Sequence, residues 1–317
     1  VYFTVSNNGS EITLTQTSLN IWHDNTSSND ETVSLKGLGG DGSTTYDINL
    51  VQTITDADGD SASSSLSLTD GGGANDNEYA FNFKDDGPSA VAPTALKGSS
   101  EGDFSAVKLT VDESLGNQVN PADTESDRVS KADFADNFTS VAPSGSTASG
   151  ASYGTDGAGS SVFSLSLTSA GGGAGVSDVK SGVYALNNGG QGDEITLSLD
   201  GVSGDIIGSA HGKTYFTISN NGSEVLLTQN ADNNIWHSNP NDHNDIDSLT
   251  GSADGSDDIT FNINLVQTIT DADGDSASAI LNLTQALDGD AGSGFVFNFL
   301  DDGPSAVAPT ALKGSSE

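Results

Sequence analysis

Two loops with the sequence Asp-Ala-Asp-Gly-Asp carry the residues best suited to hold a metal ion. Three carboxylates alternate along each loop, at Asp56, Asp58 and Asp60 and again at Asp271, Asp273 and Asp275. Alternate carboxylates in a tight loop can turn toward one point, and the Gly permits the bend. Ca²⁺ takes about six to eight oxygen ligands, so the loop supplies several of them. The sequence predicts a calcium site at each loop, with a solvated acidic turn as the alternative.

Neither loop is an EF-hand, because the first has Ser61 and Ser67 at the sixth and twelfth positions, where that motif has Gly and Glu. The remaining oxygens would have to come from backbone carbonyls, water or another loop. We therefore expect each loop to act as an internal staple on a β-hairpin.

A second candidate calcium site lies at the junction of two sequence units. The acids available there are Asp85, Asp86, Asp112 and Glu113. If residues 89–110 cross back toward the boundary, these four side chains could share one ion and stiffen the joint. The alternative is that Asp-Asp-Gly-Pro is simply a turn, since each of these residues favours turns. Asp301 and Asp302 are the corresponding pair at the end of the second unit.

Three other features invite a functional interpretation but have a simpler one. Gly189 to Glu194 partly resembles the glycine-rich nonapeptide of calcium β-rolls, yet it occurs once, which favours an ordinary loop. A Trp precedes a His in both copies, at Trp22-His23 and Trp236-His237, where a core Trp is favoured over a sugar-stacking platform. His211 and His243 have no metal-ligand partner at a suitable spacing.

Composition narrows the functional classes. The formal net charge is −36, and Asp outnumbers Glu by 36 to 9. This sign argues against nucleic acid or an anionic membrane as a partner, because both need a basic surface. There is no Cys, which excludes disulfides and thiol catalysis, and no apolar run is long enough to span a bilayer. The sequence also lacks the common catalytic motifs, so we expect a protein that is not an enzyme.

A long internal repeat divides the chain. Residues 85–101 recur unchanged at 301–317, and residues 49–63 recur unchanged at 264–278, so the unit is about 216 residues long. We expect the C-terminal part of one unit at 1–101 and one complete unit at 102–317. The complete unit could contain two subdomains, near 102–180 and 181–317.

Within the repeat, apolar residues alternate with polar ones in short runs. Such a period of two is typical of antiparallel strands with one buried face. Asn8-Gly9 and Asn221-Gly222 each lie between two such runs and indicate hairpin turns. Only residues 131–138 suggest a short helix, and the Ser/Gly/Ala-rich tract 142–160 is expected to be an exposed loop. The predicted fold is all-β: antiparallel β-sandwich modules in tandem, linked end to end.

These motifs, taken in order, resemble a known family. VDES near the start of the unit, a Gly-Asp-Glu-Ile-Thr-Leu strand, TDADGDSAS and a closing DDGP are similar to the tandem repeats of giant RTX adhesins exported by type I secretion. The resemblance implies β-sandwich extender modules and Ca²⁺ bound at Asp56, Asp58, Asp60 and the junction acids. It also implies an extracellular location on the bacterial cell surface and a role in adhesion or biofilm formation.

The leading hypothesis is therefore a calcium-stabilised structural extender that holds a distal adhesive domain away from the cell. Its partners would be the neighbouring repeats of the same chain and that distal domain, and we expect a monomer without membrane insertion. The alternative is that the modules themselves bind a ligand, such as a glycan or a protein. Near-identical copies favour the extender, since length requires repetition and specificity does not.

Overall fold

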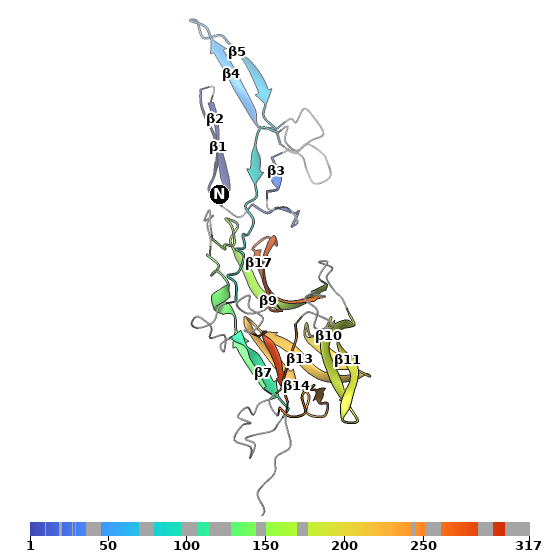
Figure 1. Ribbon diagram of the computed structural model, residues 1–317. Helices are drawn as coiled ribbons and strands as arrows, with labels where there is room; N and C mark the ends of the chain where they lie inside the picture. The colour runs from blue at the N-terminus through green and yellow to red at the C-terminus, as the bar shows by residue number, and fades with distance from the viewer. Residues whose placement is uncertain are drawn as a thin grey trace, which may run out of the picture. The chain divides into compact units, whose positions relative to one another are not determined.

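The fold was analysed in a computed structural model of the chain. The structure describes residues 1–9, 11–18, 21–26, 28, 30–35, 46–69, 79–96, 107–113, 128–143, 150–169, 177–242, 245–250, 261–284 and 294–301. Nearly all regular structure in these residues is β-strand, and they contain no α-helix (Figure 1). The prediction of an all-β fold is confirmed. No helix in these ranges is long and apolar enough to cross a membrane.

The chain forms two compact units, which are described separately. The first consists of Val1–Val91, Ser140–Ser161 and Thr268–Ser278, and the second of Ala92–Thr139, Val162–Gln267 and Ala279–Glu317. The first unit thus combines residues from both copies of the sequence repeat. The repeat boundaries themselves remain a prediction from the sequence.

The first unit contains three two-stranded antiparallel sheets, β1-β2, β3-β6 and β4-β5. Their bounds are β1 Phe3–Asn8, β2 Glu11–Gln16, β3 Thr32–Ser34, β4 Asn49–Thr55, β5 Ser61–Ser67 and β6 Asn82–Lys84. Asn8 pairs with Glu11 across the predicted Asn-Gly turn. Apolar residues alternate with polar ones from Tyr46 onward, but β4 begins only at Asn49.

The second unit is built around a seven-stranded antiparallel sheet with the order β15-β10-β11-β12-β13-β14-β8. Its strands are β8 Val129–Asp133, β10 Val179–Asn187, β11 Gly190–Leu199, β12 Ile206–Ala210, β13 Lys213–Asn221, β14 Glu224–Gln229 and β15 Ile235–Trp236. Asn221 pairs with Glu224 at the second predicted Asn-Gly turn. The short helix expected at 131–138 is found only as a 3₁₀ helix of three residues, Ala135–Asn137, because the residues up to Asp133 belong to β8.

Two three-stranded sheets complete the described structure, with the orders β16-β19-β7 and β18-β17-β9. Their strands are β7 Leu109–Asp112, β9 Ala158–Ser169, β16 Ile246–Ser248, β17 Phe261–Asp271, β18 Ser276–Asn282 and β19 Phe297–Leu300. Strands β19 and β7 pair in parallel, whereas β16 and β19 pair antiparallel. β9, β17 and β18 are each divided between the two units.

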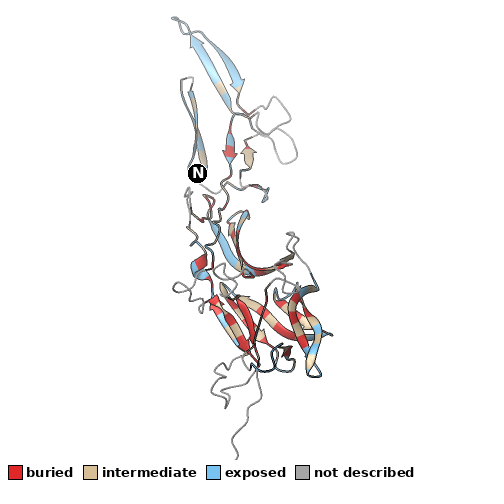
Figure 2. Cartoon of the chain, viewed as in Figure 1, coloured by how far each residue is buried: buried red, intermediate tan, exposed pale blue. Residues whose placement is uncertain are grey.

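One hydrophobic core joins the seven-stranded sheet to the strands of the three-stranded sheets. Phe216 on β13 and Phe299 on β19 are fully buried, and their ring centroids lie 4.8 Å apart. The buried faces of β13, β14 and β7 follow the alternation of the sequence, as Figure 2 shows. Packing a curved sheet against other strands around one apolar layer is the arrangement of a β-sandwich. This core, and not a disulfide, holds the second unit together.

The two copies of the repeat build the same local structure where both are described. Ser34 donates to Asn82 at 2.6 Å across β3-β6, and Ser248 donates to Asn298 at 2.7 Å across β16-β19. The surroundings differ, however. The β4-β5 hairpin is largely exposed, whereas β17 has buried residues along its whole length (Figure 2).

Candidate metal centre

The second Asp-Ala-Asp-Gly-Asp loop connects β17 to β18 and is held closed by its own backbone. The Asp271 N–H donates to the Asp275 carbonyl at 3.1 Å, and Asp271 Oδ1 accepts from Gly274 N–H at 3.0 Å and from Asp275 N–H at 2.8 Å. Gly274 has φ +113°, a conformation that L side chains rarely adopt. This turn leaves the side chains of Asp273 and Asp275 free to face a common point.

Asp85 and Asp156 face the same point from two other segments. Oxygens of Asp85, Asp273 and Asp275 lie within 4.8 Å of one another. Asp156 belongs to the loop before β9, and its carboxyl lies beside those of Asp85 and Asp273. All five acids, counting Asp271, belong to the first unit. We call Asp85, Asp156, Asp271, Asp273 and Asp275 the five-Asp cluster.

Backbone hydrogen bonds hold the three segments around the cluster. Ser89 and Ser152 exchange two N–H···O bonds of 2.9 and 3.0 Å, and Thr155 N–H donates to the Asp86 carbonyl at 3.2 Å. Ala272 N–H donates to the Gly157 carbonyl at 3.1 Å. A Cβ on Gly154 would lie 2.0 Å from the Asp86 carbonyl oxygen, so the segments approach more closely there than any other residue allows. The carboxylates are therefore positioned by main chain and not by loose side-chain contacts.

Four of the five acids are buried, and no Lys, Arg or His among the described residues forms an ion pair with the cluster. Asp85, Asp156, Asp271 and Asp275 are at most 8% exposed. Each has one oxygen without a hydrogen-bond partner in the described structure, and neither oxygen of Asp273 has one. None of the ion pairs among the described residues includes any of the five. Buried carboxylates normally have paired charges or hold a metal ion.

Burial and mutual repulsion shift the cluster's pKa values upward. Burial, with the neighbouring Asp85 carboxyl, raises the pKa of Asp156 to about 7 and that of Asp275 to about 7. Burial and Asp273 raise the pKa of Asp271 to about 6. The shifts mean that several negative charges are unfavourable here unless a cation accompanies them.

The first Asp-Ala-Asp-Gly-Asp loop has the same turn in a different environment. Asp56 Oδ1 accepts from Gly59 N–H at 3.1 Å and from Asp60 N–H at 2.9 Å, and Asp56, Asp58 and Asp60 also lie within reach of one ion. All three are exposed. A hydrogen bond with Asp58 lowers the pKa of Asp56, opposite in direction to the shift at Asp271. The turn of residues 56–60 closes through its own hydrogen bonds. It remains exposed because no other segment covers it in the described structure, as other segments cover residues 271–275.

The predicted junction acids are brought together differently from the sequence-based expectation. Asp85 joins the five-Asp cluster in the first unit, whereas Asp112 and Glu113 lie at the end of β7 in the second. Asp86 contributes its backbone to the cluster's support, donating its N–H to Asp85 Oδ1 at 2.9 Å. No cluster found among the described acids combines the four residues of the predicted site.

Glu113 instead belongs to a polar group within the second unit. Glu113 Oε1 accepts from Ile235 N–H at 2.6 Å and from Gln229 at 3.2 Å, and burial raises its pKa to about 7. β7 pairs with β19 so that Asp112 lies opposite Leu300, which brings Asp301 near Glu113. Asp301 therefore lies next to the acids of its own unit. Asp302 falls outside the described residues.

A histidine and two further acids lie close to Glu113. His237 Nδ1 is 3.0 Å from Asp247 Oδ2, and Asp245 completes a group whose ligand atoms lie within 4.8 Å of one another. Burial alone would lower the pKa of His237, but the charges of Asp247, Asp301 and Glu113 raise it overall. Sequence reasoning did not connect these residues, which are distant along the chain from Glu113. His243, the other histidine of this region, is not among the described residues.

The weaker sequence signals have structural explanations. Asn188 and Gly189, both with positive φ, form the turn between β10 and β11, so the glycine-rich stretch is a hairpin. Trp236 pairs with Tyr184 and packs edge-on against its ring at 6.5 Å, while Trp22 is 69% exposed. His211 lies 2.8 Å from Asp193, and both are exposed.

Sequence reasoning missed Asp156. The tract 142–160 was expected to be an exposed loop, but Ala151, Ser152 and Asp156 are buried and β9 begins at Ala158. Its signal was the Gly-Thr-Asp-Gly sequence, in which a lone acid is flanked by glycines that permit close approach. The same sequence is also typical of a plain turn.

Comparison with known proteins gives a family but no activity. The model of a domain of unknown function, DUF5801, matches residues 1–69 and 108–284. The chain belongs to this family. No curated protein and no solved structure matches it.

Proposed function

We propose that this chain is a calcium-stabilised structural repeat, with the five-Asp cluster as its main Ca²⁺ site. The observation that carries the proposal is that oxygens of Asp85, Asp273 and Asp275 lie within 4.8 Å of one another, with Asp156 and Asp271 next to them, and that each of the five has an oxygen without a hydrogen-bond partner in the described structure. Ca²⁺ is the cation whose ligands are predominantly carboxylate and carbonyl oxygens in large number. A hollow of about 180 Å³, lined in part by Trp22, Asp156 and Asp273, offers an entry path.

The origin of the ligands supports a mechanical role for the ion. Asp85 follows the last strand of the first sequence copy, while Asp156 and the loop 271–275 belong to the second. An ion held by both copies ties the end of one repeat to the body of the next. Together with the resemblance to RTX adhesin repeats, this supports an extender region of a large secreted bacterial adhesin, which would act at the cell surface. In this role the chain is not an enzyme.

The alternative, a ligand-binding module, has less support from the site. Trp236, the aromatic that could stack on a sugar, packs against Tyr184 in the complete copy. Trp236 is half-buried and is not among the core residues, but this ring contact occupies part of its aromatic surface. Trp22 is its exposed counterpart, and glycan-array binding would test that residue's contribution directly.

Thermal unfolding tests the proposal. We expect calcium to raise the unfolding midpoint of the first unit relative to excess chelator, because an ion that binds only the folded state stabilises it by about 2.7 kcal/mol at 100 times its Kd. Magnesium at the same concentration should have a much smaller effect, because it retains its water and demands octahedral geometry. An unchanged midpoint in calcium would refute the proposal.

A further inference from the structure

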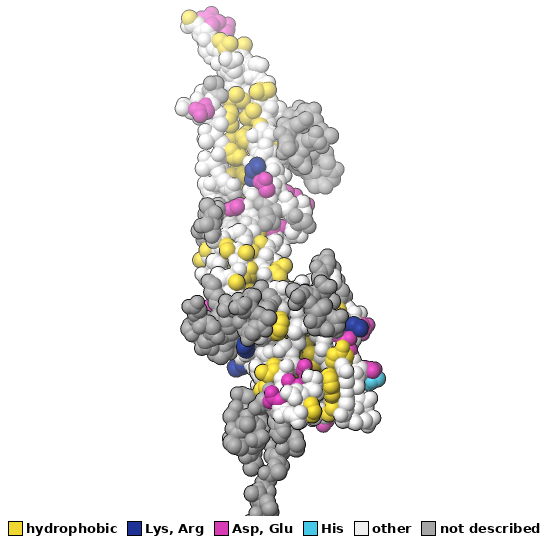
Figure 3. Space-filling view, viewed as in Figure 1, with side chains coloured by type: hydrophobic (Ala, Val, Ile, Leu, Met, Phe, Trp, Pro, Cys, Tyr) yellow, Lys and Arg dark blue, Asp and Glu magenta, His cyan; other side chains and the backbone are white. Residues whose placement is uncertain are grey.

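The β4-β5 hairpin has an uncovered face whose counterpart in the second copy is covered. Residues 49–63 and 264–278 are identical in sequence. Ile54 is 66% exposed and Leu66 is 62% exposed, whereas the equivalent Ile269 and Leu281 are 0% and 3% exposed. Figure 3 shows hydrophobic side chains gathered on the surface of the first unit. Ile54 and Ile269 lie in the identical stretch, so the difference in their burial comes from their neighbours and not from the local sequence.

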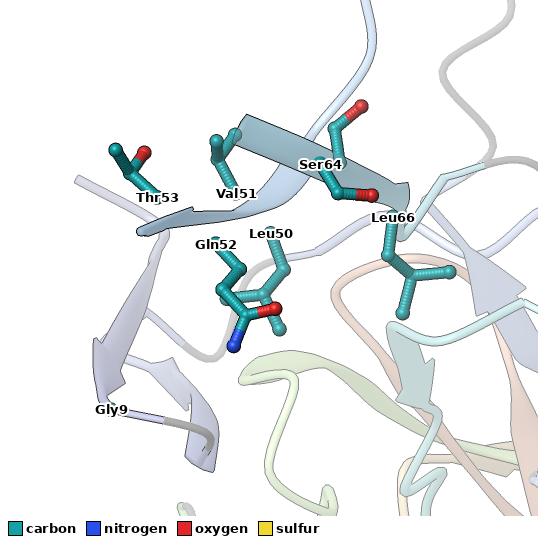
Figure 4. A pocket seen from close by; sticks show the side chains of 8 residues that line it. Gly9, Leu50, Val51, Gln52, Thr53, Ser64 and Leu66 are labelled. Atoms are coloured by element: carbon teal, nitrogen blue, oxygen red, sulfur yellow. The ribbon is translucent and has the colours of Figure 1, made fainter. Parts of the chain in front are cut away.

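Leu66 and its neighbours on the hairpin line a groove. It has a volume of about 690 Å³ and is lined by Gly9, by residues 50–53 of β4 and by residues 64–66 of β5. Figure 4 shows Leu50, Gln52 and Leu66 pointing to one side of the hairpin, with Val51 and Thr53 on the other. Such a surface, with apolar side chains bounded by Ser, Thr and Gln, can bind a partner through both apolar side-chain contacts and hydrogen bonds to its main chain.

One edge of the hairpin is also unpaired in the described structure. β4 pairs only with β5, whereas the equivalent β17 lies between β18 and β9. Leu68 N–H donates to the Ile48 carbonyl and Asp56 N–H donates to Asp60, so the even-numbered residues from 48 to 56 bond toward β5. In an antiparallel pair the alternate residues then direct their N–H and C=O groups outward. Val51 and Thr53 thus present a free main-chain edge.

The second copy identifies what fits this edge. β9 runs antiparallel to β17: Asn264 donates to Ser166 at 3.3 Å and to Thr168 at 3.4 Å, while Gly159 lies against Thr270 and Asp271. A Cβ on Gly159 would lie 2.1 Å from the Asp271 carbonyl oxygen. β4 has the sequence of β17. In a strand with the sequence of β9 paired to β4, the C-terminal half would therefore lie beside Asn49, and the residue equivalent to Gly159 would lie beside Asp56.

We propose that β4 is a docking edge for a strand with the sequence of β9, supplied by another copy of the repeat. The strand adds to the sheet antiparallel to β4, with main-chain hydrogen bonds to Val51 and Thr53. The strand that docks is one that is not paired with its own β17, because both pairings use the same edge of β9. This interaction is independent of the proposed calcium site, since it uses the outer edge of β4 and not the carboxylates.

A labelled peptide of residues 158–169, titrated into the full chain and followed by fluorescence anisotropy, tests the proposal. We expect saturable one-to-one binding. A peptide with Gly159→Val should bind at least about tenfold more weakly, because its Cβ meets a carbonyl oxygen, although Val favours strands. Equal binding of the two peptides, or no saturable binding of the native one, would overturn the proposal.

Two chain variants locate the binding edge. Val51→Pro removes an outward N–H from β4 and should weaken peptide binding, while Ser65→Pro removes the outward N–H opposite it on β5 and should leave binding unchanged. Binding that survives Val51→Pro would place the peptide elsewhere and overturn the proposal.

Discussion

Replacing Asp275 by Asn should have opposite effects on stability with and without calcium. Without a cation, the variant removes one negative charge from a buried cluster in which the pKa of Asp275 is raised to about 7. With calcium, it removes a charged ligand. The matched control is Asp60→Asn, the same position of the exposed loop.

The expected change in the free energy of unfolding follows from the raised pKa of Asp275. A raised pKa means that the folded state binds a proton at higher pH than the unfolded chain does, so cation-free stability is lost as pH rises from about 4 to about 7. One pKa unit corresponds to about 1.4 kcal/mol. The shifts of Asp156, Asp271 and Asp275 belong to one interacting group, so they do not add. We expect Asp275→Asn to raise the chelated unfolding free energy by about 1–2 kcal/mol at pH 7.5.

Differential scanning calorimetry at pH 7.5 and pH 5, in chelator and in calcium, measures these effects. In chelator the variant should be more stable than the native chain at pH 7.5, and this advantage should be smaller at pH 5, where Asp275 is protonated in the folded state but ionised in the unfolded chain. In calcium at pH 7.5 it should be less stable. Destabilisation of the same size in both conditions would refute the reasoning, because Asp275 would then be an ordinary structural residue.

Three further outcomes are expected. Gly154→Ala, whose Cβ would meet the Asp86 carbonyl at 2.0 Å, should displace Asp85 and weaken calcium binding in a calorimetric titration, while Gly201→Ala, with nothing within 4 Å, should not. Phe299→Ala should destabilise the second unit by about 3–5 kcal/mol in chemical denaturation, because it leaves a cavity beside Phe216, and should not change calcium affinity. Because the pKa of Glu113 is raised to about 7 in the fold, the second unit should lose stability without a cation as the pH rises toward 7. Glu113→Gln should remove this pH-dependent loss in the free energy of unfolding.

The strands were predictable because their signal is local. Alternation of apolar and polar residues predicted the all-β fold, and the two Asn-Gly pairs marked the turns of β1-β2 and β13-β14. The parallel pairing of β7 with β19 was not predictable, because it joins segments about 190 residues apart through a register that no local pattern encodes. Residues 131–138 have no strong period, and there the tertiary pairing of β8 with β14 determined the structure.

The candidate site was predictable only in part, because only its local motif is visible in the sequence. The carboxylate loop is a local motif, and its closed turn forms in both copies. Which acids complete it depends on the packing of distant segments: Asp85 meets the loop that begins at Asp271, and Asp156 enters from a tract without any metal-binding pattern. Two identical loops therefore differ in burial, and the sequence of either loop does not distinguish them.

A crystal structure of the chain grown in calcium would test the central claim most directly. We predict one Ca²⁺ within the five-Asp cluster, with oxygens of Asp85, Asp156, Asp273 and Asp275 at about 2.3–2.6 Å. Water among these carboxylates, with calcium bound only at the exposed loop of Asp56, Asp58 and Asp60, would contradict the account.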